Sequence, residues 1–295
     1  MRSRVPATLL GAYYLLAASP APAADTAQEV TIPAGKIPLH GCYRTPQGAG
    51  PYPVMIFNHG SEKDPAPCGP QDLGDFYQQQ QGFAFFTFQR HGHGASRGEY
   101  IMDLQRQAYL RHPLNVSAAE REAVALQELY NQDVAAAVGW LTRQPWADSQ
   151  HLAMTGISFG AIQTILAAQK GLGIRAFVAF APAAQSWNPA LAERLTRALR
   201  LARAPLLVIQ AHNDYSVEPS RVLGAELDKK GAPNQARVYA AFGTTTQDGH
   251  WKFGTRRDGI AVWRRMSARF SPRHCSERRR VGDGPVGGRA QRGVK

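Results

Sequence analysis

The sequence predicts an α/β fold with a mostly parallel sheet. Short apolar segments that do not alternate with polar residues recur along the chain, at residues 52–57, 83–88, 152–155, 176–180 and 206–210, with a weaker one at 238–242. Strands buried on both faces have this pattern. Helical patterns separate these segments, and strands that alternate with helices form βαβ units with right-handed crossovers.

The elements at the start of the chain follow from local signals. Residues 30–43 alternate and break at Ala34-Gly35, which predicts a hairpin. The longest helix is predicted over residues 117–142, where Ser117 fits an N-cap and Glu120 completes a capping box. Further helices are predicted at residues 161–170, 189–201, 220–230 and 260–270.

Composition limits the class of protein. The 295 residues are 44% hydrophobic and 19% charged, which excludes a disordered chain, a collagen-like fibre and a coiled coil. The formal net charge is +12, but the first 23 residues carry +2 and residues 271–295 carry +5. We therefore expect no nucleic-acid partner for the folded body, and we expect the Arg/Gly-rich tail at 271–295 to be disordered.

The N-terminus has the layout of a secretory signal peptide. Arg2 and Arg4 precede an apolar segment at residues 5–18, and the small-x-small site Ala21-Pro22-Ala23 follows. We expect cleavage near residue 23, a secreted or periplasmic protein, one folded domain over residues 24–270, and no transmembrane segment.

Export would expose the cysteines to an oxidising compartment, where Cys42 and Cys68 can form a disulfide. Cys275 would then be left over. Two unlinked thiols at residues 42 and 68 agree equally well with the sequence.

The pattern Gly-x-Ser-x-Gly occurs twice, around Ser158 and around Ser96. A nucleophile elbow needs a strand directly before the serine and a helix directly after it. Residues 151–155 and 161–168 meet this requirement for Ser158. Ser96 follows a glycine-rich loop, and residues 99–101 open no clear helix. The context favours Ser158 as the nucleophile.

A serine hydroxyl needs a base, and in this kind of sheet the acid and then the base come later in the chain, after strand ends. Asp214 follows the strand at residues 206–210, and His250 follows the last strand in a loop. We predict that His250 is the base and that Asp214 orients it. Glu218 and Asp248 remain alternatives for the acid, and His212 for the base.

An oxyanion hole requires backbone N–H groups aimed at the developing negative charge. The amide of Phe159, directly after the nucleophile, is one candidate, and the amide of Ser61, after the strand at residues 52–57, is the other.

These motifs resemble the dienelactone hydrolase-like group of α/β-hydrolases. The anchors are residues 53–60, Arg90-x-Gly92-x-Gly94-x-Ser96, the Ser158 motif, Asp214 and Gly249-His250. The resemblance implies an α/β-hydrolase fold with about eight mostly parallel strands flanked by helices, an antiparallel N-terminal hairpin, and no metal or organic cofactor. Several members use a cysteine nucleophile, so the serine here favours a general carboxylic ester over the lactone.

The expected function is a serine hydrolase that cleaves small esters or lactones through an acyl-enzyme. A peptidase of the same fold and a hydrolase-fold binding protein without catalysis are the alternatives. Residues 100–116 are expected to form a small cap over the site. Candidate pocket residues are His59, Tyr109, Arg111 and Trp187; a solvated arginine and a packed tryptophan are the alternatives for the last two. The oligomeric state does not follow from the sequence.

Overall fold

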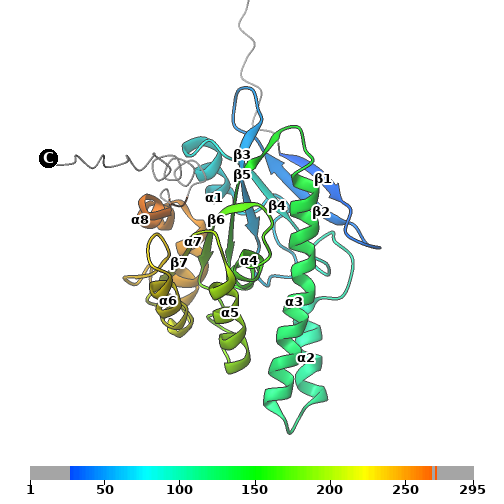
Figure 1. Cartoon of the computed structure of the whole chain (residues 1–295), viewed down its shortest axis with the longest axis vertical. Helices are drawn as coiled ribbons and strands as arrows, with labels where there is room; N and C mark the ends of the chain where they lie inside the picture. Colours follow the sequence, from blue (N-terminus) through cyan, green and yellow to red (C-terminus); the bar gives the residue numbers. More distant parts are fainter. Residues whose placement is uncertain (1–26, 268–269, 271–295) are drawn as a thin grey trace, which may run out of the picture.

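The protein, described here by a computed structural model over residues 27–267 and 270, has an eight-stranded sheet at its centre (Figure 1). The strand order is β1-β2-β4-β3-β5-β6-β7-β8. The strands are β1 (Gln28–Ile32), β2 (Leu39–Arg44), β3 (Tyr52–Asn58), β4 (Ala84–Phe88), β5 (Ala147–Ile157), β6 (Ile174–Phe180), β7 (Leu206–Ala211) and β8 (Gln235–Tyr239). Pairing is antiparallel from β1 to β2 and from β2 to β4, and parallel across the rest. The predicted α/β-hydrolase fold is confirmed.

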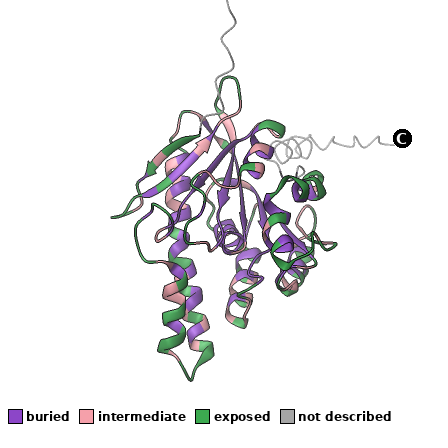
Figure 2. Cartoon of the chain, turned by 180° about the vertical axis from the view of Figure 1, so that it is seen from behind, coloured by how far each residue is buried: buried purple, intermediate pink, exposed green. Residues whose placement is uncertain are grey.

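Helices cover both faces of the sheet, and the central strands between them are buried (Figure 2). Along β3, Val54 and Ile56 belong to one core and Met55 and Phe57 to the other. The first core is built with α3 (Val116–Leu141), α4 (Phe159–Ala168), α5 (Pro189–Leu201) and α6 (Glu218–Lys230). The second core is built with α1 (Gln71–Asp75), the π-helical turn η1 (Phe76–Gln80), α7 (Phe253–Thr255) and α8 (Arg257–Ser267).

Two details of the predicted helices were wrong. The side chain of Asn115, not Ser117, caps α3 by accepting a hydrogen bond from the amide of Ala118 at 3.0 Å. Residues 101–111, where no clear helix was expected to open, form α2 (Ile101–Arg111). This helix packs along the start of α3, and the two form a projecting hairpin (Figure 1).

The last strand lies three residues before its predicted position at 238–242. β8 ends at Tyr239 because the chain beyond it pairs with a side chain instead of a strand: Asn213 donates to the carbonyl of Phe242 and accepts from its amide. As an edge strand β8 is only partly buried, which explains its weak apolar pattern.

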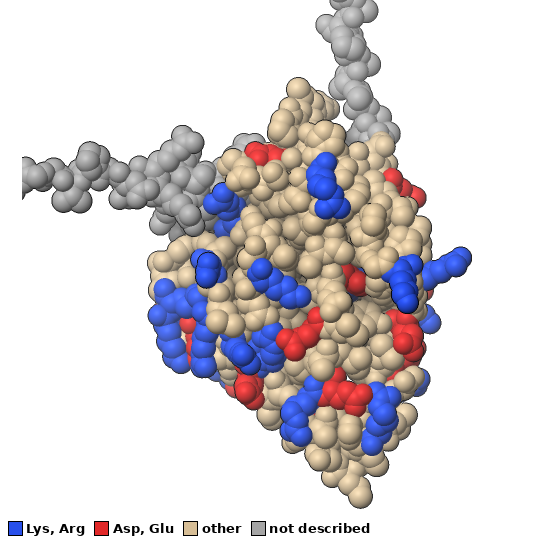
Figure 3. All heavy atoms as spheres, turned by 45° about the vertical axis from the view of Figure 1, so that its right-hand side comes forward, with Lys and Arg blue, Asp and Glu red and all other residues tan. Residues whose placement is uncertain are grey.

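The described surface carries both signs of charge. On the face shown in Figure 3, Lys and Arg side chains lie interspersed with Asp and Glu side chains. Within residues 27–267, the structure contains no helix with the length and apolarity needed to span a bilayer. The predicted signal peptide and basic tail, including Cys275, lie outside the described residues.

Candidate active site

Ser158 occupies a sharp turn between β5 and α4. Its backbone dihedrals are φ 57° and ψ −118°, a conformation that L-residues rarely adopt and that the surrounding structure must enforce. Both flanking glycines are required, because a Cβ at Gly156 would lie 2.3 Å from the carbonyl oxygen of Gly160, and one at Gly160 would lie 2.0 Å from that of Asn58. The backbone therefore forms the predicted elbow at the carboxyl end of β5.

Asp214 and His250 meet at the carboxyl end of β7. The Nδ1 atom of His250 lies 2.7 Å from Oδ1 of Asp214, and both side chains are almost fully buried. Because a carboxylate only accepts hydrogen bonds, Nδ1 carries the proton in this pair and Nε2 of the neutral ring is left to accept one. This tautomer is the one that a general base for a serine hydroxyl requires.

The sequence analysis placed His250 in a loop, and this detail was wrong. It sits in the π-helical turn η2 (Asp248–Lys252), which leads directly into α7. The carboxylate of Asp248 stabilises the start of this turn by accepting hydrogen bonds from the amides of Thr244 and Thr245, both at 2.9 Å. Asp248 is thus used locally, as a turn residue.

The other rivals lie apart from the Asp214–His250 pair. Glu218 starts α6 and pairs with Arg221 at 2.6 Å, and His212 is exposed. The second Gly-x-Ser-x-Gly serine, Ser96, is buried and donates its hydroxyl to the carbonyl of Gln89 at 2.7 Å.

Two further residues, which the sequence analysis missed, hold the carboxylate of Asp214. Gln210 donates from Nε2 to Oδ2 of Asp214 at 2.7 Å, and the amide of Tyr215 donates to Oδ1 at 2.6 Å. Gln210 is fully buried and is itself fixed by the hydroxyl of Ser220, which donates to its Oε1 at 2.5 Å. A glutamine at the end of an otherwise apolar strand was the sequence signal for this role. The ring of Tyr215 also packs edge-on against His250 at 5.1 Å.

Ser158 and the pair share one edge of the sheet, because β5, β6 and β7 are parallel neighbours and each residue follows a strand end. Within the described part of the chain, the hydroxyl of Ser158 has no hydrogen-bond partner, His250 included. A missing bond of this kind does not exclude a catalytic pair, since catalytic hydrogen bonds are often long in free enzymes.

The candidate oxyanion donors flank Ser158. Phe159 is the first residue of α4, where backbone N–H groups have no partner within the helix. Ser61 lies in the loop after β3, which touches the elbow: a Cβ at Gly160 would lie 2.4 Å from the carbonyl oxygen of His59. Neither amide has a hydrogen-bond acceptor among the described residues.

Glu62 places a carboxylate beside the elbow. A Cβ built on Gly60 would lie 2.5 Å from Oε2 of Glu62 and 3.7 Å from the carbonyl oxygen of Ile157, the residue before Ser158. Burial raises the pKa of this carboxyl, although the amides of Glu62 and Gly60 and the charges of Arg90 and His250 act in the opposite direction. The sequence analysis did not single out this residue.

The candidate pocket residues lie in different environments. His59 is buried at the start of the loop after β3, with its Nδ1 3.0 Å from the carbonyl oxygen of Gly60. Arg111 is paired with Glu122 on α3. Tyr109 is 42% exposed on α2, and Trp187 is partly buried against the first core, which agrees with the packed alternative.

The loop after β3 is also tied to β2 by a disulfide. Cys42 and Cys68 are bonded, with their Cα atoms 5.0 Å apart. Among the described residues, no group of three or more His, Cys, Asp or Glu side chains is placed to hold a metal ion.

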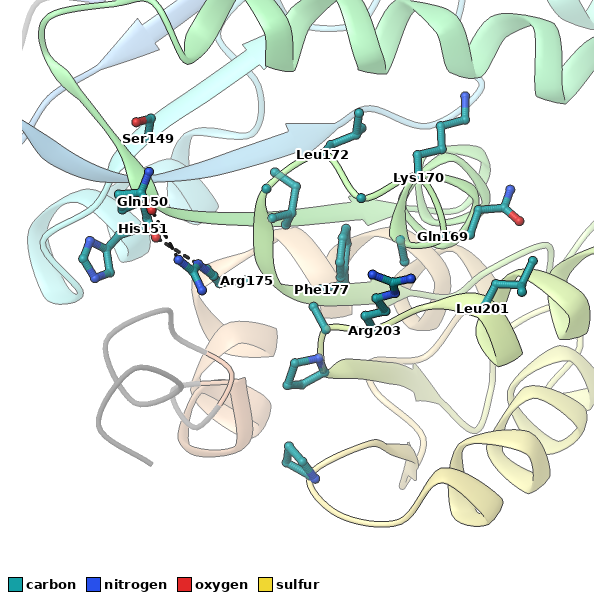
Figure 4. A pocket seen from close by; sticks show the side chains of 17 residues that line it. Ser149, Gln150, His151, Gln169, Lys170, Leu172, Arg175, Phe177, Leu201 and Arg203 are labelled. Carbon is teal, nitrogen blue, oxygen red and sulfur yellow. Dashed lines mark hydrogen bonds between the residues drawn. The ribbon is translucent and has the colours of Figure 1, made fainter. Parts of the chain in front are cut away.

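A cleft of about 1000 Å³ lies at the opposite edge of the sheet, where β6 and β7 begin (Figure 4). Its walls include Lys170, Arg175 and Arg203, and Arg175 is turned toward Gln150, whose backbone carbonyl accepts from its Nε at 3.2 Å. Because Ser158 and the Asp214–His250 pair lie at the carboxyl ends of the strands, this cleft is not their substrate pocket.

Comparison with known proteins gives one family and many similar structures. The family model of the X-Pro dipeptidyl-peptidase (S15 family) matches residues 43–251. No curated protein matches the sequence.

Among solved structures, an acylaminoacyl peptidase from Pyrococcus horikoshii superposes with a TM-score of 0.62 at 16% identity, covering 84% of this chain and 42% of that one. An esterase from Pyrococcus furiosus superposes with a TM-score of 0.57 at 16% identity, covering 83% of this chain and 91% of the esterase. A dienelactone hydrolase from Anabaena variabilis gives 0.55 at 18% identity, covering 83% and 96%. The chain thus spans about two fifths of the peptidase and nearly the whole of the other two.

Proposed function

We propose that this chain, which belongs to the X-Pro dipeptidyl-peptidase (S15) family of α/β-hydrolases, is a serine hydrolase. We further propose that it cleaves carboxylic ester or lactone bonds through an acyl-enzyme. The observation that carries this proposal is the buried Asp214–His250 pair at the sheet edge where Ser158 is held in an elbow. The dienelactone hydrolase-like preference for small acyl substrates is supported by the neighbours whose length this chain spans, an esterase and a dienelactone hydrolase.

The proposed reaction has two acyl transfers. Nε2 of His250 takes the hydroxyl proton of Ser158 as Oγ attacks the ester carbonyl, and Asp214 stabilises the imidazolium that forms. The amides of Phe159 and Ser61 donate to the oxyanion. His250 then protonates the leaving alkoxide, which yields the acyl-serine. Water then attacks this ester as it gives a proton to His250, and His250 returns that proton to Oγ of Ser158 as the carboxylic acid leaves.

Labelling with a fluorophosphonate tests the nucleophile, since this probe forms a covalent bond with an activated serine. The wild-type protein should be labelled, whereas Ser158→Ala should not, and kcat should fall by about 10⁶ in that variant. Equal labelling of the two proteins would refute Ser158. No labelling of the wild type, together with no turnover of any ester, would favour the binding-protein alternative.

A dipeptidyl peptidase is the second candidate, favoured by the family match and by Glu62. A carboxylate beside the elbow is chemically suited to bind the ammonium group of a free peptide N-terminus. A p-nitrophenyl ester, a lactone, and an X-Pro p-nitroanilide with a free or acetylated N-terminus would separate the candidates. Glu62→Gln should raise KM only for the free-amine anilide if the protein is a peptidase, with Asp64→Asn, an exposed acid in the same loop, as the control.

We also propose that the protein is exported, on the strength of residues 1–23. N-terminal sequencing of protein recovered from the culture medium or periplasm should find a new terminus near residue 24. An intact N-terminus on protein confined to the cytoplasm would contradict this proposal.

A further inference from the structure

The loop that follows β3 is held by its carbonyl groups. We call residues 59–65 the oxyanion loop and residues 89–100, which follow β4, the clamp segment. Each of five oxyanion-loop carbonyls meets a donor from the clamp segment: Gly60 meets Arg90 Nη2 at 2.5 Å, Ser61 the hydroxyl of Tyr100 at 2.5 Å, Glu62 His93 Nδ1 at 2.8 Å, Lys63 the amide of Gly94 at 2.8 Å, and Pro65 Gln89 Nε2 at 2.9 Å.

This arrangement fixes the direction of the Ser61 amide. In a trans peptide unit the C=O and the following N–H point in opposite directions. Arg90 holds the carbonyl of Gly60, so the N–H of Ser61 must point away from Arg90. That N–H has no acceptor among the described residues, and the loop that carries it lies against the elbow.

We propose that Arg90 is a positioning residue, which orients the Ser61 amide as an oxyanion donor by gripping the carbonyl of Gly60. The proposal rests on the proposed function of the same site. Arg90 also contacts the other donor residue, because its guanidinium lies 5.0 Å over the ring of Phe159. One side chain thereby touches Phe159 and the peptide group that joins Gly60 to Ser61.

His59 packs against the same contact. Its Nε2 accepts from the amide of Arg90 at 3.2 Å, and its Nδ1 lies 3.0 Å from both the oxygen of Gly60 and Nη2 of Arg90. Burial, together with the charge of Arg90, lowers the pKa of His59 well below its usual value and keeps the ring neutral. The imidazole therefore helps to fix the position of the Arg90 guanidinium beside the Gly60 carbonyl.

The cost of burying Arg90 argues against a purely stabilising role. The side chain is fully buried, and its Nε and Nη1 atoms have no hydrogen-bond partner in the described structure. The negative charges of Glu62 and Asp133 offset part of this cost. Because two donors stay unsatisfied, an apolar side chain of similar size would still serve stability as well or better. The proposed orientation of the oxyanion loop accounts for the buried cation.

The clamp segment is held by hydrogen bonds of its own. Ser96 donates to the carbonyl of Gln89 and accepts from the amide of His40 at 2.9 Å, which joins Ser96 to the start of the segment and to β2. The second Gly-x-Ser-x-Gly match thus has a structural use. It closes the loop that presents Arg90.

Substituting Arg90 by methionine tests the proposal. Arg44 provides a matched control, because it too is buried, lies over a phenylalanine ring and has unpaired donors. It pairs with Asp75 and lies beside the start of β4, at the edge of the sheet opposite to the elbow. On p-nitrophenyl acetate, Arg90→Met should lower kcat by roughly 10²-fold or more, as the loss of an oxyanion donor does, with KM changed less than threefold. Arg44→Met should change neither by more than threefold, and Arg90→Lys should restore part of kcat.

A trifluoromethyl ketone inhibitor supplies the readout that a structural role would not move, since it forms a charged hemiketal with the serine. The Ki of this inhibitor should rise in Arg90→Met by the same factor by which kcat/KM falls. If Arg90→Met and Arg44→Met lose activity equally while the wild type is labelled and active, this inference is wrong and the proposed function stands. A wild type that is neither labelled nor active overturns the proposed function itself.

A milder variant decides the matter if Arg90→Met does not fold. Tyr100→Phe removes only the hydroxyl that holds the carbonyl of Ser61 and keeps the ring. It should lower kcat about tenfold at unchanged KM and unchanged melting temperature. An unchanged kcat in this variant would overturn the proposal that the clamp segment sets the geometry of the oxyanion loop.

Discussion

Lowering the pH should destabilise the protein through His93. His93 is fully buried against the oxyanion loop, with its Nδ1 on the carbonyl of Glu62 and the ring of His59 4.6 Å away. Burial, and then the positive charge of Arg90, lower the pKa of His93 to about 3. The side chain is therefore neutral in the folded state at a pH where the unfolded chain binds a proton.

The sign and size of the effect follow from linkage. Between pH 6.5 and pH 3 the unfolded state holds more protons than the folded state at this residue, so the free energy of unfolding falls as the pH falls. With an unfolded pKa of about 6.5, a shift from pH 7.5 to pH 5 should cost about 2 kcal/mol through His93 alone. His59, whose pKa is also lowered, should add to this loss.

The variant His93→Asn isolates the contribution, because an asparagine amide can replace Nδ1 as the donor to Glu62 but does not titrate. The free energy of unfolding of both proteins is measured in urea at pH 7.5 and at pH 5. Between these two pH values it should fall by about 2 kcal/mol less in His93→Asn than in the wild type. The exposed His40 gives the control, and His40→Asn should behave as the wild type. An equal pH dependence in wild type and His93→Asn would refute the claim that burial keeps this ring neutral.

Three further predictions concern the elbow, the disulfide and the triad carboxylate. Gly160→Ala should lose fluorophosphonate labelling and about 2 kcal/mol of stability, since the new methyl group meets a carbonyl oxygen at 2.0 Å; Gly139→Ala, whose nearest neighbour is at 4.0 Å, should not. Replacing Cys42 and Cys68 by serine should lower the free energy of unfolding by about 3.5 kcal/mol in the chain-entropy model, measured in urea, and an unchanged midpoint would contradict it. Gln210→Leu should lower kcat roughly tenfold by removing a hydrogen bond to the charged carboxylate, and a normal kcat would deny that contact a role.

The sequence predicts the parallel sheet well because its central strands are buried on both faces. A segment such as residues 52–57 has to be apolar at every position, and this demand is visible without any knowledge of its neighbours. The elbow was predictable for a related reason. A strand, a serine between glycines and a small-residue helix are consecutive in the chain, so the whole motif is local.

Features that depend on distant partners were not predictable in this way. In α2, only Ile101 and Ala108 are buried, and the side chain of the N-cap residue Tyr100 makes no capping hydrogen bond, so the helix owes its existence to packing on α3. The clamp segment meets the oxyanion loop across about thirty residues of sequence, as the bond from Arg90 to Gly60 shows. No local pattern reports such a contact.

The two Gly-x-Ser-x-Gly matches show what a short motif does and does not determine. Around Ser158 the glycines admit carbonyl groups from the elbow and from β3, which forces the serine into its strained conformation. Around Ser96 the same five-residue pattern closes a turn, with Gly94 at φ 52° against the side chain of Gln89 and a β-bridge between His93 and Ser96. The glycines grant close approach in both places, but the flanking strand and helix decide what approaches. A nucleophile is therefore specified by the strand that ends before the serine and the helix that begins after it. The pentapeptide only makes that geometry sterically possible.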